Sequence, residues 1–274
     1  MEASPEAARR PRAAAGTGDF PWWLVAAALI GAILTWRIVA DDLYSQVFAI
    51  VARGVGITVF VTLVAFALAC LLGLVLAVAV LSPSLIARQV ARFYIEIVRG
   101  IPILVLLFYI AFVATPGLVA AWNWLIEPLG FEPLLTRDVP LIWRAIIALT
   151  IGYSAYVAEV FRAGIEAIDR GQVEAAKALG FSAGQRFRLI VLPQAVRTML
   201  PPLGNFFIAM IKDSSLVSVL GVADIAQMGK VYASGSFRYF EAYNVVTFIY
   251  LVMTIGLSLL LRRLERHLNR ARMA

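Results

Sequence analysis

The chain has 274 residues, of which 62% are hydrophobic and 15% are charged, whereas a soluble globular domain carries about 45–50% apolar and about 25% charged residues. This composition argues against a soluble domain and predicts an all-α membrane protein, because an apolar helix of roughly 20 residues crosses a bilayer. The formal net charge of +7 raises the question of nucleic acid. The basic residues flank apolar spans and form no basic face interleaved with aromatic residues, so nucleic acid is excluded as a partner.

Six apolar segments are long enough to be predicted as transmembrane helices. They cover residues 22–40, 54–81, 93–114, 141–161, 200–222 and 243–261. The first could be read as a secretory signal, but Ile38–Val39–Ala40 lacks the small residue that stands three positions before a cleavage point. We therefore expect an uncleaved anchor helix, followed by a short joint over 41–53 and five further spans.

The distribution of Lys and Arg predicts the orientation, because cytoplasmic loops retain these residues. With the N-terminus inside, most of the cations fall in the tail 1–21, the loop after the second span, the long loop 164–199 and the tail 263–274. The opposite side carries mainly acidic residues, namely Asp41, Asp42, Glu127, Glu132 and Asp138. Both termini are therefore expected on the cytoplasmic side.

The chain offers few residues for metal binding or catalysis. Its single cysteine, Cys70, lies in an apolar run, and its only histidine, His267, lies in a basic tail. No cysteine spacing suggests a metal site, and one histidine leaves too little for a triad. We expect no metal site and no catalytic residue.

The loop 164–199 has a readable local structure. Residues 172–179 are nearly all good helix formers, and Gly180 stands where a helix commonly ends, because glycine adopts the left-handed conformation at low cost. Ser182 and Gln185 form a capping box, so a second short helix is predicted from Ala183 to Leu192. Pro193 is expected to stop it. The prediction is a helix–glycine–helix element outside the membrane.

The same loop carries a motif. It consists of Glu174, Ala175 and Ala176, followed by Gly180, Ile190, Leu192 and Pro193. This spacing resembles the EAA loop of permease subunits of ABC importers. Residues 96–102, 153–162 and 192–218 resemble the branch of that family that imports polar amino acids (histidine, glutamine, arginine or opines), and the resemblance covers roughly residues 50–262.

The resemblance implies an architecture and a set of partners. Residues 54–262 would form a five-helix permease domain with the EAA loop at 164–193, preceded by an extra helix and periplasmic joint at 22–53 and flanked by cytoplasmic tails at 1–21 and 263–274. In this family the loop docks into a groove of a cytoplasmic ATPase dimer. The expected partners are that dimer, a second identical or similar permease subunit, an external solute-binding protein and the lipid bilayer of a bacterial cytoplasmic membrane.

A nucleotide site of this chain's own is not expected. A phosphate-binding loop needs the pattern G-x-x-x-x-G-K-[ST], and the sequence comes nearest to it at Gly229–Lys230, where Val231 follows. We therefore expect a transport subunit rather than an enzyme. It would bind no cofactor, with ATP and Mg²⁺ held by the partner ATPase.

Four polar residues interrupt the fifth span, namely Lys212, Asp213, Ser214 and Ser215. A Lys or Asp at mid-membrane costs on the order of 2.5–3.5 kcal/mol on insertion scales. Adjacent helical residues do not face each other, so Lys212 and Asp213 cannot neutralise one another. Either the helix breaks here to line a substrate cavity, as discontinuous helices of transporters do, or these residues pair with other helices for stability.

Two further charged pairs lie near span ends and are assigned structural or gating roles. Glu159 and Arg162 share one face near the inner end of the fourth span, where we expect them to brace that end. Glu96 and Arg99 flank the inner end of the third span, where snorkelling accounts for them, and Gly100 with Pro102 should bend that helix. The alternative function is an ion-gradient-driven secondary transporter, which leaves the helix–glycine–helix element without a purpose.

Overall fold

The computed structural model describes residues 22–270. The predicted tail 1–21 and the last four residues of the predicted tail 263–274 lie outside the described residues. The α-helices are α1 (Trp22–Ala40), α2 (Asp42–Val51), α3 (Val55–Leu81), α4 (Leu85–Gly100), α5 (Ile103–Tyr109), α6 (Thr115–Ile126), α7 (Leu141–Glu166), α8 (Arg170–Ala178), α9 (Ala183–Arg186), α10 (Leu192–Asp213), α11 (Ile225–Ser236) and α12 (Tyr239–Arg270). Short 3₁₀ segments are η1 (Ala52–Gly54), η3 (Glu127–Leu129), η4 (Thr136–Asp138) and η6 (Ser214–Leu220), and π-helical turns are η2 (Ile110–Ala114) and η5 (Phe187–Val191).

Five helical segments are long and apolar enough to cross a membrane. They are Asp42–Leu81, Ile103–Leu129, Leu141–Glu166, Ala183–Leu220 and Tyr239–Arg266, and the shorter apolar stretch Val25–Ala40 lies within α1. The predicted class, an all-α polytopic membrane protein with five long spans and one additional N-terminal helix, is confirmed. The predicted joint 41–53 is itself helical and continues through η1 into α3.

The predicted third span, 93–114, is wrong. Helix α4 ends at Gly100, and the next two residues are extended, with φ, ψ of −98°, 127° at Ile101 and −58°, 138° at Pro102. A proline disfavours the helical conformation in the residue before it and has no N–H to donate, so the expected bend is a complete break. Ala91, Ile95 and Val98 are buried, whereas Arg92 and Glu96 are exposed, so α4 is amphipathic and the span begins at Ile103.

Helices α3 and α7 form the centre of the bundle. They pack along each other, and a Cβ on Gly73 of α3 would lie only 2.8 Å from Cγ1 of Val157. After the turn that follows α3, helix α4 packs against both α3 and α7. Helix α10 packs on α7 and α12, and α11 packs on α2 and α12. The main core cluster includes Val61, Leu107 and Leu149.

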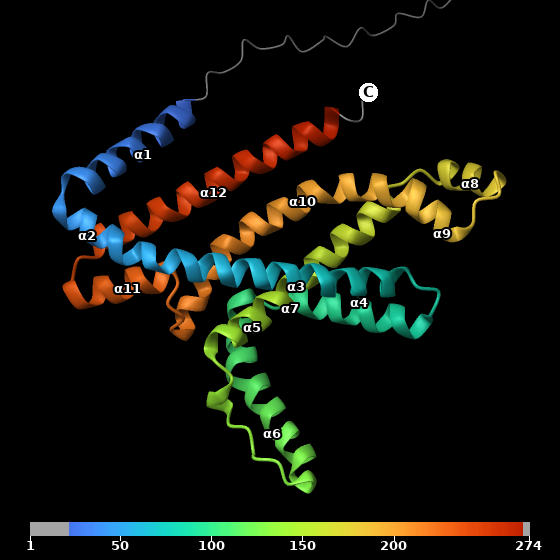
Figure 1. The fold of residues 1–274 in the computed structure, drawn as a ribbon, viewed down its shortest axis with the longest axis horizontal. Helices are drawn as coiled ribbons and strands as arrows, with labels where there is room; N and C mark the ends of the chain where they lie inside the picture. The colour runs from blue at the N-terminus through green and yellow to red at the C-terminus, as the bar shows by residue number, and fades with distance from the viewer. Residues whose placement is uncertain (1–21, 271–274) are drawn as a thin grey trace, which may run out of the picture.

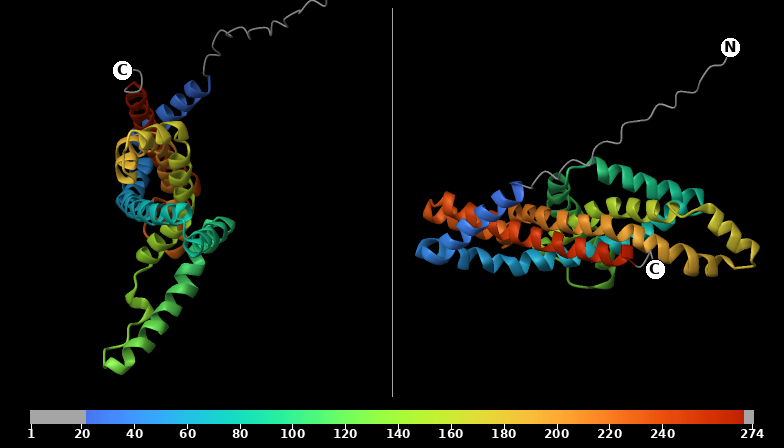
Figure 2. Two further views of the ribbon diagram at one scale, coloured as in Figure 1. Left: turned by 90° about the vertical axis from the view of Figure 1, so that its right-hand side faces the viewer. Right: turned by 90° about the horizontal axis from the view of Figure 1, so that it is seen from above.

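The α5–α6 segment leaves this bundle. In Figures 1 and 2, α6 points away from the other helices, and the chain returns from its far end to the start of α7. Arg144, in the first turns of α7, is buried and fixes this return. Its guanidinium donates to the carbonyl oxygens of Ala111 in η2 (2.9 Å), Val139 (2.9 Å) and Thr136. Sequence reasoning did not single out this residue.

The two described chain ends point the same way. Helices α1 and α12 run antiparallel, so the start of α1 and the end of α12 point toward the end of the molecule that carries α8, α9 and the α3–α4 turn (Figure 1). This arrangement agrees with termini on one side of a membrane. Which side that is stays a prediction.

Candidate functional site

Helix α8 carries Glu174, Ala175 and Ala176 and ends shortly before Gly180, where the sequence predicted a glycine stop. Its first turn is capped by Asp169, whose side chain accepts from the N–H of Gly171 at 2.6 Å. Gly180 has a φ of +83°. The N–H of Gly180 donates to Lys177 O at 3.0 Å and that of Phe181 to Ala176 O at 3.1 Å. This pair of bonds is a Schellman motif, so the predicted glycine stop is confirmed.

The second helix begins where the capping box predicts but does not end at Pro193. The N–H of Gln185 donates to Ser182 Oγ at 3.3 Å, and the N–H of Ser182 donates to Gln185 Oε1 at 2.8 Å. The expected stop at Pro193 is wrong, because α9 continues through η5 into α10. In the π turn the N–H of Leu192 donates to Phe187 O, five residues back.

The π turn explains how the helix tolerates this proline. In a regular α-helix, Pro193 would clash with the carbonyl of Leu189 and leave that oxygen without its donor. A π turn shifts the hydrogen-bond register at this point, and the side-chain Nε2 of Gln194 donates to the neighbouring carbonyl oxygen of Ile190 at 3.0 Å. Ile190, Leu192 and Pro193 therefore lie inside one continuous helical segment.

The EAA loop projects as a helical hairpin at one end of the molecule (Figures 1 and 2). Gln194 Nε2 also donates to Gln172 Oε1 at 2.7 Å, which ties α8 to α10. Ala176 is buried, whereas Glu174 and Ala175 are exposed. Leu179, beside the glycine stop, is 77% exposed. Phe187 and Leu189 of the same hairpin are also exposed.

Beside α8 is a hollow of about 690 Å³ between the end of α7, α8 and η5. It is lined by Ile165, Glu166, Ile168, Arg170, Val173, Glu174 and Val191. The glutamate of the motif therefore lies at the boundary between the hairpin and the membrane helices. A change in hairpin position would alter the surroundings of this carboxylate.

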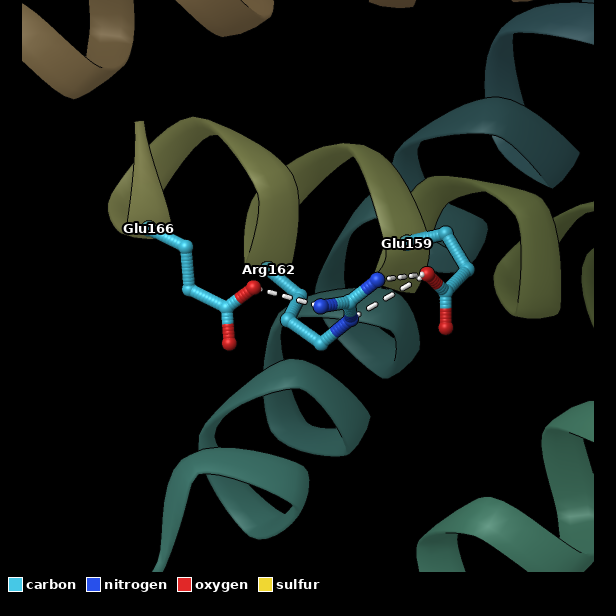
Figure 3. A network of polar contacts seen from close by, with 3 residues as sticks. All are labelled: Glu159, Arg162 and Glu166. Carbon is cyan, nitrogen blue, oxygen red and sulfur yellow. Dashed lines mark hydrogen bonds and ion pairs between the residues drawn. The ribbon is translucent and has the colours of Figure 1, made fainter. Parts of the chain in front are cut away.

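The end of α7 that leads into the EAA loop carries a three-residue ion network. Arg162 donates through Nη2 (2.7 Å) and Nε (3.1 Å) to Glu159 Oε2, and through Nη1 (2.5 Å) to Glu166 Oε2 (Figure 3). Glu159 and Arg162, which share one face as expected, form an ion pair, and Glu166 is an additional partner. All three residues lie on one helix, so the network stiffens the end of α7 rather than joining two helices.

The four polar residues of the fifth span lie at a change of helix type. Helix α10 ends at Asp213, and η6 continues as a 3₁₀ segment. Lys212 is exposed, and Asp213 accepts a hydrogen bond from the hydroxyl of Tyr153 at 2.7 Å. Ser214 is buried and donates to Ile211 O at 2.7 Å, and Ser215 is half-buried. The two charges point to different surroundings, as the sequence predicted.

A groove of about 510 Å³ lies between α4, α7 and α10. Its lining residues are Arg99, Tyr156, Glu159, Val160, Ala163, Gly164, Ala167, Thr198, Pro202 and Phe206. The groove brings together Arg99 and Glu159, which the sequence analysis treated as separate braces of two helix ends. Glu96 is exposed on α4 and does not belong to this lining.

Three aromatic side chains, Tyr153, Tyr156 and Phe206, form an aromatic cluster between the groove and Asp213. The guanidinium carbon of Arg99 lies 5.6 Å from the ring centroid of Tyr156. The Tyr156 and Phe206 centroids are 5.8 Å apart, and those of Tyr153 and Phe206 are 6.4 Å apart. The cluster was missed from the sequence, although the spacing of Tyr153 and Tyr156 places them on one helix face.

A second missed group is the buried Asp224, the N-cap of α11. Its Oδ1 accepts from the N–H of Gln227 at 2.8 Å, and its Oδ2 accepts from the hydroxyl of Tyr250 on α12 at 3.1 Å. A Cβ on Gly54 would lie 2.4 Å from the carbonyl carbon of Asp224, so the start of α11 is pressed against η1. Burial raises the pKa of the Asp224 carboxyl above its ordinary value, and its hydrogen bonds oppose that rise.

Known proteins are similar to this chain in sequence. Residues 69–273 match the family model described as "Binding-protein-dependent transport system inner membrane component". The "Probable amino-acid permease protein YxeN" of Bacillus subtilis is 36% identical over 81% of this chain and 93% of its own length. The "Glutamine transport system permease protein GlnP" of Escherichia coli K12 is 36% identical over 79% and 92%.

A solved structure agrees with the sequence matches. A crystal structure of an amino acid ABC transporter with histidines superposes with a TM-score of 0.69 and 36% identity, covering 84% of this chain and 98% of that one. The two chains therefore share one fold over most of their length. The chain belongs to the family of binding-protein-dependent transport system inner membrane components, the permease subunits of ABC importers.

Proposed function

We propose that this subunit forms the passage for polar amino acids in an ATP-driven importer of a bacterial inner membrane. The observation that carries the proposal is the EAA hairpin, with its Schellman stop at Gly180 and its continuous connection into α10. The substrate class follows from the similar proteins, which are named as amino-acid and glutamine permeases. The division into tails at 1–21 and 263–274, an added helix and joint at 22–53 and a permease domain at 54–262 belongs to the proposal.

The hairpin is proposed as the contact with a separate ATPase dimer. The residues assigned to coupling are Glu174, Ala175, Ala176, Gly180, Ile190, Leu192 and Pro193. The exposed Leu179 and the exposed carboxylate of Glu174 support an exterior partner. Hydrolysis of ATP with Mg²⁺ would occur on that partner, so this chain would be a transport subunit and not an enzyme.

The polar residues at the junction of α10 and η6 are proposed as the substrate contact near mid-membrane. These are Lys212, Asp213, Ser214 and Ser215. The cost of placing a Lys and an Asp in an apolar span supports a functional reason for them. Lys212 is exposed on the surface of the single subunit, so a second permease subunit packed beside it would enclose the ammonium group in a shared passage. An external solute-binding protein would deliver the amino acid.

Reconstitution tests the function. The subunit is produced with its ATPase and a solute-binding protein in liposomes, and ATPase activity is measured with each amino acid in turn. Stimulation by one or a few polar amino acids, together with their ATP-dependent uptake, is the expected result. Uptake that follows an ion gradient and needs no ATPase would contradict the proposal and support a secondary transporter.

A further inference from the structure

We propose that the groove between α4, α7 and α10 is an inner amino-acid subsite, in which Arg99 binds the carboxylate of the substrate and Glu159 binds its ammonium group. The inference rests on the proposed function and adds a second substrate-binding site to the one proposed at Asp213. This inner subsite lies on the other side of the aromatic cluster from Asp213.

Arg99 is suited to receive an anion. Among the described residues the ion pairs join Arg162 with Glu159 and Glu166, and Arg238 with Glu241, so Arg99 has no carboxylate partner there. Its guanidinium lies over the ring of Tyr156. A cation held against an aromatic face keeps its position while its N–H groups point outward in the plane of the guanidinium. A substrate carboxylate could then take two parallel hydrogen bonds from them.

Glu159 is suited to receive a cation, although it already has a partner. Both hydrogen bonds from Arg162 end on Oε2 of Glu159, as Figure 3 shows. Oε1 is thereby left to accept from a second donor. Arg162 in turn shares its charge with Glu166, so the network carries two carboxylates for one guanidinium. The surplus of one negative charge favours a bound ammonium group.

The groove has a size and a wall that fit an amino acid. Its volume of about 510 Å³ falls within the range of roughly 300–1,000 Å³ that is usual for small-molecule pockets. Tyr156 and Phe206 supply an apolar wall for the stem of a side chain, and the small side chain of Ala163 lines the groove on α7. A Cβ on Gly164 would lie 2.4 Å from Met199 Cγ, so α7 and α10 are in close contact beneath the groove.

The aromatic cluster separates this inner subsite from the proposed substrate contact at Asp213. Phe206 borders the groove and contacts Tyr153, which holds Asp213. The groove lies toward the part of α7 that leads into the EAA loop. A substrate that moves from Asp213 toward the EAA loop passes Phe206 and reaches the groove. There the cationic Arg99 and the net negative Glu159 network match the two charges of a zwitterion.

The test compares variants in the complete complex. Arg99→Gln and Glu159→Gln remove one charge each from the groove. Arg92→Gln and Glu132→Gln are the controls, because Arg92 is an exposed arginine of α4 and Glu132 an exposed glutamate of the loop between η3 and η4, and both lie outside the groove lining and the Arg162 network. Binding of radiolabelled L-glutamine, L-arginine and L-histidine is measured in parallel on purified complexes without the solute-binding protein, and uptake and ATPase activity are measured with it.

The expected result is a loss of at least about tenfold in affinity for the transported amino acid in Arg99→Gln and Glu159→Gln, in line with the loss of a charge-assisted hydrogen bond. The controls should stay within about twofold of wild type in affinity, uptake and ATPase activity. The ratio of affinities for the amino acid and for its analogue without the carboxylate should fall in Arg99→Gln. This ratio does not depend on how much of a variant folds.

Two outcomes overturn the inference. One is groove variants that bind and transport like the controls. The other is an unchanged ratio for the carboxylate-free analogue in Arg99→Gln. In both cases the wild-type complex still responds to amino acids, so the proposed function survives. Failure of the proposed function is recognised separately, because no amino acid would then stimulate the wild-type ATPase.

Discussion

The hydroxyl of Tyr153 and the carboxylate of Asp213 are 2.7 Å apart and join α7 to the last turn of α10. The bond connects the helix that leads into the EAA loop with the helix that leaves it. Asp213 is therefore positioned by a neutral donor rather than neutralised by a cation. In the proposed substrate contact, this carboxylate would meet the ammonium group of the amino acid.

Asp213→Asn should impair transport far more than assembly. The asparagine keeps the shape and an oxygen acceptor for Tyr153 but loses the charge that would meet a substrate ammonium. We expect weaker amino-acid binding to the solubilised complex and an unfolding temperature close to that of wild type. Tyr153→Phe is the matched variant, since it removes the donor and keeps the carboxylate. Unchanged affinity with lower thermal stability in Asp213→Asn would assign the carboxylate a structural role only.

Gly180→Val should abolish uptake while the subunit remains in the membrane. A Cβ at Gly180 meets no neighbour, so the only penalty is the positive φ, which costs roughly 1–3 kcal/mol in a β-branched residue. Gly184→Val is the control, because Gly184 is equally open but lies in the helical α9. Uptake and complex yield are measured for both. Equal uptake by the two variants would argue against a coupling role for the turn.

Asp224→Leu should lower the stability of the complex by roughly 1–3 kcal/mol, since it leaves the buried hydroxyl of Tyr250 and the N–H of Gln227 without their acceptor. Asp224→Asn keeps an acceptor and removes the charge. Because burial raises the carboxyl pKa above its ordinary 3.8, the ionised form destabilises the folded state above that raised pKa, and the effect is lost as the pH falls through it. Asp224→Asn should therefore match or exceed wild type in thermal unfolding at neutral pH, and the difference should shrink on acidification.

The N-terminus should lie on the cytoplasmic side and α2 on the opposite side. Ser45 is exposed on α2, so in a Cys70→Ser background a cysteine at position 45 should react with an impermeant thiol reagent in intact cells. A cysteine at position 4 should react only after permeabilisation. Labelling of position 4 in intact cells would reverse the topology.

The sequence was sufficient where structure depends on local chemistry. Gly180 and the Ser182–Gln185 box each act within five residues, so the glycine stop and the helix start were predictable. Pro193 was misread because the π turn that accommodates it depends on the register of the surrounding helix. The break at Pro102 was underestimated because α4 has enough apolar residues on one face to resemble the start of a span.

Contacts between residues far apart in the chain could not be predicted from the sequence. Nothing in the sequence spacing indicates that Tyr153 bonds to Asp213 or that Arg99 and Glu159 line one groove. Each pair comes from two helices whose packing angle is set by many core contacts. Arg144 was hidden for a similar reason, because its acceptors are backbone carbonyls, and any residue can supply those.

Because α9 continues through the π turn into α10 without a break, a movement of the hairpin is transmitted directly to α10. Helix α10 has 22 residues and is therefore about 33 Å long at a rise of about 1.5 Å per residue. A tilt of about 5° applied at the hairpin would displace the far end of such a helix by about 3 Å. That displacement is comparable with the length of the Tyr153–Asp213 hydrogen bond, so a small movement at the surface is enough to make or break a single contact inside the membrane.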